Sequence, residues 1–520
     1  MSATGGVEPT ESTEHTGVRS HSHRRVWVAA AVALALVLSA GAGFAVGTVV
    51  GGGGTQPEDV LPDTVLAYVD VDLDPAAQQK INLVRLLGQF PDVEQEYGRE
   101  PDIRAVVVDW LVEGTELQDA NASEWIGDRV GAGLSWDADA KTLTPVAAIQ
   151  VTDEEEAVAD LGRVLAPDQI ALSDGYVVVT GDLLNEFSAL DELDGLVGTG
   201  GPPTQSAAEV VAAGRSAPLS QSVAFTDVFG HLDDGLLSMY VDGKGVAAAG
   251  QQIAGGLGLG APAVSDSLAS AAESGQVGAV LRAEPNALEL LAWSSAAPPS
   301  GSAPAELAPT LPESTLFALE FTGGAEQVAN RWAQTLEGGL TPKEFERQLA
   351  SLEAQYGVRL PDDLQTLVGE DAVLAVDGEG LLTSVPGIGL RSVTDPAAGT
   401  ALASQIESAL ASLTGGFGIT ARGTADGMVV ATTDEYAARL EAGDGSLGTD
   451  TTYQEALPDA GDASYLVWID FSAVRGFVAL AAPDAGGVLG PLDAFGATVS
   501  PDGGGSLVRA RLVFSEESDS

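Results

Sequence analysis

The chain of 520 residues contains no cysteine. This absence excludes disulfide bonds, zinc sites built on thiolates, cysteine nucleophiles and the lipid-modified cysteine of a bacterial lipoprotein. Only four histidines occur, and His15, His21 and His23 all lie near the N-terminus. The remaining histidine, His231, cannot build a multi-histidine metal site by itself.

Basic residues are also scarce, since 23 Lys and Arg stand against 75 Asp and Glu. Acids and arginines balance within residues 1–50, so the net charge of −52 belongs to the rest of the chain. Such a surface repels the phosphates of nucleic acids, and we therefore expect no nucleic-acid partner. The composition leaves open whether divalent ions bind to this acidic surface.

The motifs of the common catalytic sites are missing as well. The sequence has no G-x-S-x-G, no S-x-x-K and no H-E-x-x-H, and no Gly-rich phosphate loop in a suitable context. We therefore expect no cofactor and no enzyme activity. An envelope hydrolase remains the alternative, because a glycosidase needs only two carboxyl groups. A serine triad would have to use His231, which we interpret instead as a solvated or capping residue.

One long apolar run is present near the N-terminus. Residues 26–50 carry no charge. As a helix they would reach about 37 Å, enough to cross a hydrocarbon core of about 30 Å. Three arginines precede the run, so the positive-inside rule predicts a disordered cytoplasmic tail over residues 1–25 and an extracytoplasmic body. The competing interpretation is a cleaved signal peptide with residues 40–42 as its cleavage site.

Small residues recur at every fourth position of this apolar run. Such a stripe lets two helices approach closely in lipid, and we expect a weak homodimer through the plasma-membrane segment. The residues assigned to this packing are Ala35, Ser39, Gly43 and Gly47. Chance alignment is the alternative, because alanine and glycine are common throughout the chain.

The body of the chain repeats itself in six places that follow the same order. The matches pair 61–70 with 311–320, 125–134 with 367–376, 143–149 with 382–388, 174–182 with 426–434, 232–242 with 457–470, and 277–285 with 495–503. Repetition of this kind predicts two related modules. We place a Gly-rich linker at 51–59, module 1 at 60–296, a Pro/Ser/Ala-rich linker at 297–308 and module 2 at 309–515.

Each module alternates short β-branched strands with helical patterns. Helices are predicted over residues 79–90 and 397–413, and Asp153 is predicted to cap a helix that begins at residue 154. The sequence therefore predicts an α+β fold. It consists of two tandem related modules with mainly antiparallel sheets, covered by helices on one face, behind one N-terminal transmembrane helix.

Residues Asp70, Asp72 and Asp74 have the spacing of a calcium loop. A calcium-binding EF-hand would need glycine where Pro75 stands and glutamate where Ile81 stands. The second copy also replaces two of the three aspartates. We therefore interpret residues 68–73 as a strand whose valines face the core and whose aspartates face water. Weak calcium binding is the alternative.

The same segment carries a family resemblance. Residues 61–80 fit the pattern LPxxxxxYVxVDxDPxxxQK, and Trp125-Ile126-Gly127 follows later. The pattern resembles a family of bacterial, mainly actinobacterial, membrane-anchored proteins known as a domain of unknown function. The resemblance covers nearly all of residues 60–515. It implies an extracytoplasmic α+β body behind one transmembrane helix, and it implies no catalytic or binding residues.

Five tryptophans of the body lie within apolar patterns. Core packing is the expected role, and a sugar or lipid site is the alternative, for Trp110, Trp125, Trp293, Trp332 and Trp468. Taken together, these observations predict a membrane-anchored, extracytoplasmic binding or scaffold protein of the cell envelope. Its partner would be an envelope protein or an apolar ligand. The alternatives are a carrier of an apolar ligand and a hydrolase that uses acidic residues.

Overall fold

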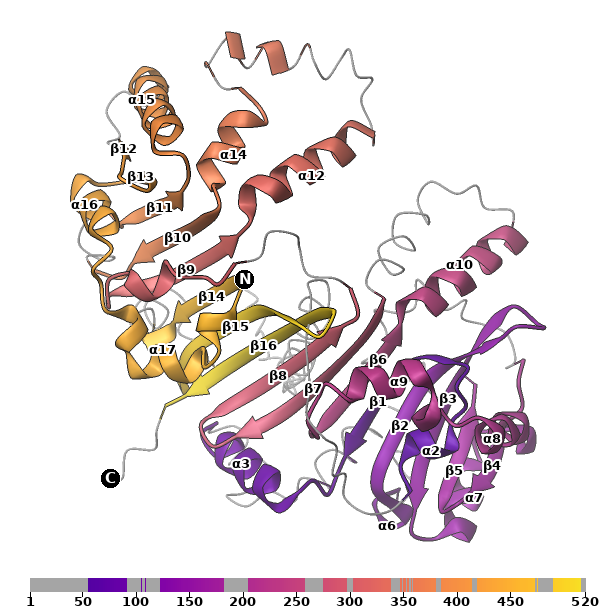
Figure 1. Cartoon of the computed structure of the whole chain (residues 1–520). Coiled ribbons are helices and arrows are strands. Elements are labelled where there is room, and N and C mark those ends of the chain that lie inside the picture. The colour runs from indigo at the N-terminus through magenta and orange to yellow at the C-terminus, as the bar shows by residue number, and fades with distance from the viewer. Residues whose placement is uncertain are drawn as a thin grey trace, which may run out of the picture.

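The computed structural model describes residues 55–90, 122–181, 204–257, 275–296, 303–337, 359–379, 385–413, 419–472 and 490–515, with a few isolated positions between them. Sixteen strands of these residues form one antiparallel sheet that carries helices (Figure 1). The predicted α+β class with antiparallel pairing is therefore confirmed. The prediction of separate sheets is wrong, because strand β8 (Ala287–Ser294) pairs with β16 (Gly505–Phe514) and joins the two halves.

The sheet consists of two runs of eight strands. The first run contains β1 (Val65–Asp72), β2 (Ile126–Asp137), β3 (Thr142–Val151), β4 (Ile170–Ser173), β5 (Tyr176–Thr180), β6 (Leu237–Asp242), β7 (Gln276–Glu284) and β8. The second run contains β9 (Thr315–Thr322), β10 (Asp371–Asp377), β11 (Ile388–Val393), β12 (Thr420–Gly423), β13 (Gly427–Ala431), β14 (Tyr465–Asp470), β15 (Leu492–Asp502) and β16.

The spatial order of the strands is repeated in the two runs. The first run is ordered β4-β5-β3-β2-β1-β6-β7-β8, and the second is ordered β12-β13-β11-β10-β9-β14-β15-β16. The register repeats as well, since Asp70 lies opposite Ser238 and Glu320 lies opposite Leu466. The sequence matches place these pairs at equivalent positions. Antiparallel pairing of the equivalent edge strands β8 and β16 then relates the halves by an approximate two-fold axis.

One sequence match is displaced in the structure. Residues 143–149 were matched to 382–388, which pairs Ile149 with Ile388. Ile149 lies opposite Val130 of β2, whereas Ala372, the equivalent of Val130, lies opposite Ser392. Ile149 therefore corresponds to Ser392, because the connection before β11 differs in length from the one before β3.

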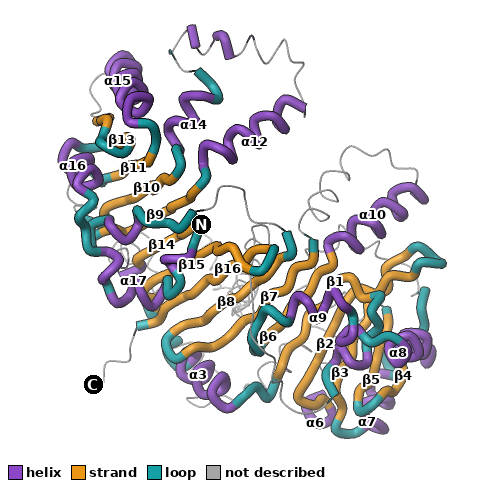
Figure 2. Tube along the Cα trace, in the orientation of Figure 1, coloured by secondary structure: helices purple, strands orange, loops and turns teal. Residues whose placement is uncertain are grey.

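Helices lie on both faces of the sheet (Figure 2). The first half carries α2 (Pro57–Val60), α3 (Ala77–Leu87), α6 (Ala122–Trp125), α7 (Glu154–Leu161), α8 (Ala207–Ser216), α9 (Val223–Phe229) and α10 (Gly243–Leu257). The second half carries α12 (Gly324–Glu337), α14 (Asp362–Val368), α15 (Pro396–Leu413), α16 (Asp434–Ala442) and α17 (Thr451–Ala456). The predicted helices at 79–90 and 397–413 correspond to α3 and α15. Asp153 caps α7 as predicted, accepting hydrogen bonds from the N–H groups of Glu155 and Glu156 at 3.0 Å each.

The prediction that helices cover one face only is therefore wrong. In the first half, Tyr68 of β1 packs with α8 and α9 on one face, while Val71 packs with α7 on the other. In the second half, Val429 of β13 packs with α16, and its neighbour Met428 packs with α15. Side chains alternate between the faces of a strand, so each strand needs apolar residues on both sides when both faces are covered.

A buried ion cluster lies where the two halves meet. Glu289 of β8 is 2% exposed, and its carboxylate lies 2.7 Å from the guanidinium of Arg509 on β16. Arg511 of β16 and Arg282 of β7 each lie 3.6 Å from the same carboxylate. Asp459 binds the other side of Arg509 at 2.7 Å. The cluster connects both halves, and its buried carboxylate is stable only because cations surround it.

Candidate functional site

The aspartates of the predicted strand 68–73 differ in their environments. The strand itself is present as β1, and Asp74 follows its end, where it binds Lys80 at 2.9 Å. Asp72 accepts a hydrogen bond from the N–H of Asp74 at 3.0 Å, as in a turn. The prediction that Asp70 and Asp72 face water is wrong, since both are half-buried. Helices on both faces of the sheet leave no solvent-facing side at this part of β1.

Asp70 belongs to an acid cluster with Glu58 of α2. The hydroxyl of Tyr68 donates to Glu58 at 2.8 Å. Burial raises the pKa of Asp70 well above its usual range, and the neighbouring Glu58 carboxylate raises it further, while Ser238 and Arg129 lower it. Burial also raises the pKa of Glu58.

Gly131 of β2 explains how the helix comes so close. A Cβ atom at this position would lie 2.5 Å from Pro57 and 3.0 Å from the Tyr68 ring. Glycine therefore lets α2 lie directly on the sheet and bring the Glu58 carboxylate to the Tyr68 hydroxyl.

The second half has an acid pair at the same place. Glu320, the equivalent of Asp70, is fully buried and accepts hydrogen bonds from the N–H groups of Leu307 and Ala308 at 2.7 and 2.6 Å. These residues lie at the start of the short helix η5 (Ala308–Thr310). Asp371 is hydrogen-bonded to Glu320; burial, and then the charge of Glu320, raise the pKa of Asp371 to about 8. The pair therefore retains a proton at neutral pH.

The two acid sites differ in how their charge is balanced. At the position equivalent to Asp371, the first half has Arg129, whose positive charge lowers the pKa of Asp70 and Glu58. The second half uses a shared proton instead of a cation. In both sites, other groups of the protein donate hydrogen bonds to the carboxyl groups. This arrangement suits a structural role better than a role in acid–base catalysis.

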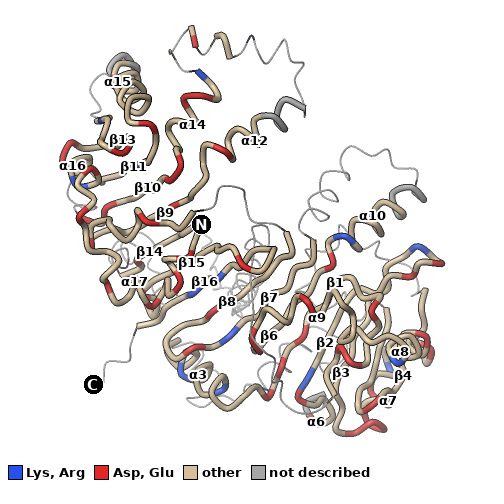
Figure 3. Tube along the Cα trace, viewed as in Figure 1, with Lys and Arg blue, Asp and Glu red and all other residues tan. Residues whose placement is uncertain are grey.

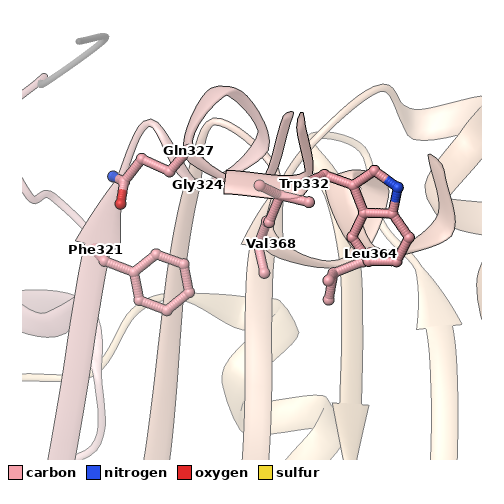
Figure 4. A pocket seen from close by; sticks show the side chains of 7 residues that line it. Phe321, Gly324, Gln327, Trp332, Leu364 and Val368 are labelled. Atoms are coloured by element: carbon pink, nitrogen blue, oxygen red, sulfur yellow. The ribbon is translucent and has the colours of Figure 1, made fainter. Parts of the chain in front are cut away.

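An apolar groove lies on the second half, at the end of β9. It has a volume of about 260 Å³. The residues that line it come from β9, α12 and α14, namely Phe321, Gly324, Gln327, Val328, Trp332, Leu364 and Val368. Figure 4 shows Trp332 and Leu364 at one end and Phe321 with Gln327 at the other. None of the acids described above lines this groove.

The groove arises from a difference between the two halves. In the first half, α3 follows β1 and packs on β7, where Asn82 donates to the carbonyl of Ala283 at 2.7 Å and Leu86 is buried. In the second half, the corresponding helix α12 packs on α14 instead. Gly324 permits this contact, because a Cβ there would lie 2.9 to 3.0 Å from Phe321 and Val368.

The tryptophans separate into two groups. Trp125, Trp293 and Trp468 are at most 4% exposed and belong to the cores, as expected. Trp332 is half-buried in the groove, and Trp110 lies outside the described residues. Sequence reasoning named Trp332 but missed Phe321, Leu364 and Val368. The Gly-Gly pair at the start of α12 was the available signal, since it permits close helix contact.

His231 packs against an aromatic ring. Its imidazole stacks on Trp293 with ring centroids 4.3 Å apart and planes 10° from parallel. His231, predicted to be solvated or capping, is therefore half-buried rather than fully solvated. The stack fixes the end of α9 on β8.

The predicted transmembrane-packing residues Ala35, Ser39, Gly43 and Gly47 lie outside the described residues, as does the whole run 26–50. Within the described part of the chain, no helix combines the length and apolar character needed to cross a bilayer. The same part contains no group of three or more acidic or histidine side chains arranged to hold a metal ion.

Comparison of the chain with protein-family models, with curated proteins and with solved structures gives no match.

Proposed function

We propose that the chain is a membrane-anchored, extracytoplasmic binding or scaffold protein of the cell envelope that contacts its partner through the α12–α14 groove. The groove carries this proposal, because its lining is apolar and half-exposed. Apolar surface that remains accessible beside packed helices is a common mark of an interaction site. The resemblance of residues 61–80 to a membrane-anchored family and the apolar run 26–50 support the anchor.

The repeated strand order supports a further part of the proposal, that the body is an internal duplicate of one module. Two halves joined through β8 and β16 would form a continuous, rigid support. In the first half, α3 packs on the sheet. In the second half, the equivalent helix α12 packs on α14, and the two helices form the groove.

The size of the groove favours a protein partner over a carried lipid. Pockets for small-molecule ligands usually measure about 300–1,000 Å³, whereas this groove holds about 260 Å³. That volume suits one or two apolar side chains. A hydrolase is less well supported, because the acid pair with raised pKa values lies among protein hydrogen bonds and not in the groove.

Photo-crosslinking in intact producing cells tests this proposal. A benzophenone side chain replaces Val328 in the groove or, as the control, Val223, an exposed valine of α9 with 83% of its surface accessible. We expect a discrete protein adduct from position 328 that is lost with Trp332→Ala and absent from position 223. Equal labelling at both positions, or none at either, would contradict a groove-borne partner.

A further inference from the structure

The lining of the groove carries no charge. Figure 3 shows acidic positions on many elements of both halves, yet none of the seven residues that line the groove is Asp, Glu, Lys or Arg. Gln327 is the only one of the seven with a side-chain amide. Recognition inside the groove therefore depends on apolar contact and on the hydrogen bonds that Gln327 can make.

The amide of Gln327 has one end bound to the protein and the other end free. Its Nε2 donates to the carbonyl of Thr322, the last residue of β9, at 3.0 Å. This bond turns Oε1 the other way, and Figure 4 shows the oxygen on the side of the Phe321 ring. Within the described part of the chain no group donates a hydrogen bond to Oε1, and the half-buried side chain does not enclose it. Gln327 therefore offers a free acceptor at one end of an apolar groove.

Aromatic rings lie at both ends of the groove. Figure 4 shows Trp332 at one end and Phe321 at the other. A ring that enters between them can form offset or edge-to-face contacts, which stabilise aromatic pairs beyond the area that they bury. The volume of about 260 Å³ admits one large side chain. An aromatic side chain therefore suits the groove better than an aliphatic one.

We infer that the groove binds a tyrosine or tryptophan side chain of a partner protein, and that Gln327 selects it through the phenol hydroxyl or the indole N–H. This inference rests on the proposed function and adds the chemistry of the partner. The ring would lie between Trp332 and Phe321, with its donor at Oε1. Phenylalanine would fill the same space but would cover Oε1 without supplying a donor, and an acceptor that loses water without gaining a partner lowers the affinity. Tyrosine and tryptophan are also among the side chains that most often dominate the affinity of protein interfaces.

Calorimetric titration of the full chain in phospholipid nanodiscs, with empty nanodiscs as the blank, tests the inference. The probes are four short peptides that differ only in one central residue, which is tyrosine, phenylalanine, tryptophan or tryptophan methylated on the indole nitrogen. Within the tyrosine–phenylalanine pair and within the tryptophan pair, only one member carries the donor. We expect the donor-bearing member of at least one pair to bind about threefold to tenfold more tightly, the effect of one hydrogen bond. The pair that shows this preference identifies the side chain that the groove accepts.

Two glutamine variants show whether the preference comes from Gln327. Gln327→Leu removes the acceptor, so it should abolish the preference while the donor-free peptides bind as before. Gln454→Leu is the matched control, because the exposed Gln454 of α17 lies outside the groove and also donates its Nε2 to a backbone carbonyl, that of Gly448 at 2.9 Å. This control should leave the preference unchanged. Trp332→Ala should weaken the binding of all four peptides.

The outcomes separate this inference from the proposed function. If both members of each pair bind equally well and all depend on Trp332, the groove remains a binding site and selection by Gln327 is wrong. The same conclusion follows if Gln327→Leu weakens the donor-bearing and donor-free peptides equally, since Gln327 would then act only on the shape of the groove. If no peptide depends on Trp332, the groove does not bind, and the proposed function fails together with the inference.

Discussion

The carboxyl groups of Glu320 and Asp371 share a buried site that contains two acidic side chains and no cation among the groups that shift their pKa values. Glu306 contributes its backbone, and burial, followed by the charge of Glu320, raises the pKa of the nearby Tyr453 of α17. A second negative charge in this site would be costly, because water is excluded and the remaining partners are backbone N–H groups. Retention of one proton is therefore a condition for the observed packing of η5 on β9.

This proton makes stability depend on pH. The pKa of Asp371 is raised to about 8 in the folded chain, against about 3.9 in the unfolded chain. The protonated Asp371 carboxyl therefore contributes fully to the free energy of unfolding below pH ~4. This contribution is lost as the pH rises toward ~8, at up to ~1.4 kcal/mol per pH unit. Thermal unfolding measured across this range should show Asp371→Asn with a shallower decline than the wild-type chain, because asparagine keeps a donor without a charge.

Asp426 provides the control for this measurement. Burial alone would raise the pKa of Asp426, but hydrogen bonds from Thr424 and Arg391, together with the charge of Arg391, lower it below its usual range. Asp426→Asn should therefore leave the decline between pH 5 and 8 unchanged. An Asp371→Asn chain that declines as steeply as the wild type would show that Asp371 is already ionised at neutral pH.

At the scale of elements, the contact between α12 and α14 depends on one glycine. In Gly324→Val, the new side chain would meet Phe321 and Val368, which a Cβ alone would approach to 2.9 and 3.0 Å. We expect the helices to separate, with a loss of about 1–3 kcal/mol in stability and weaker partner binding. Crosslinking from position 328 and thermal unfolding measure the two effects.

Gly461 is the matched control, since a Cβ at that position would have no neighbour within 4 Å. Gly461→Val should change neither the stability nor the crosslinking by a measurable amount. If Gly324→Val behaved in the same way, the close contact of α12 with α14 would not shape the groove.

Local sequence patterns predicted the elements well. The valines of β1, the Asp153 cap of α7 and the apolar spacing of α3 are decided by neighbours along the chain. The pairing of β8 with β16 was not predictable, because it joins residues more than 200 positions apart and leaves no periodic signal. The groove was missed for a related reason, since α3 and α12 have similar patterns yet pack on different neighbours.

At the scale of the whole molecule, Glu289 connects the two halves. Glu289→Gln would leave three guanidinium groups without the buried carboxylate that balances them. Arg509 would keep its ion pair with Asp459, and Arg282 would keep Asp233 and Glu284, so part of the positive charge stays balanced. We therefore expect a loss of about 1–3 kcal/mol, the range for a lost hydrogen bond to a charged group. Asp434→Asn removes an ion pair between Asp434 and Arg422, in which the Asp434 side chain is 81% exposed. This variant should lose less than about 1 kcal/mol of stability. Thermal unfolding of both variants shows whether the loss of Glu289 lowers the stability more than the loss of Asp434 does.

The absence of cysteine allows a direct test of the proposed topology. A single cysteine in place of Ser20 or Val223 would be the only thiol in the chain. In intact cells, a membrane-impermeant maleimide should label Val223→Cys and leave Ser20→Cys unlabelled until the membrane is opened. Labelling of Ser20→Cys in intact cells would place the N-terminus outside and reverse the proposed orientation.

Native mass spectrometry of the full chain, released gently from the membranes of its producing cells, shows whether the groove holds a protein partner. We predict an added mass of protein size on the wild-type chain that is lost from Trp332→Ala. A bare chain in both samples, or a bound mass of only a few hundred daltons that Trp332→Ala retains, would contradict a protein partner held in the α12–α14 groove.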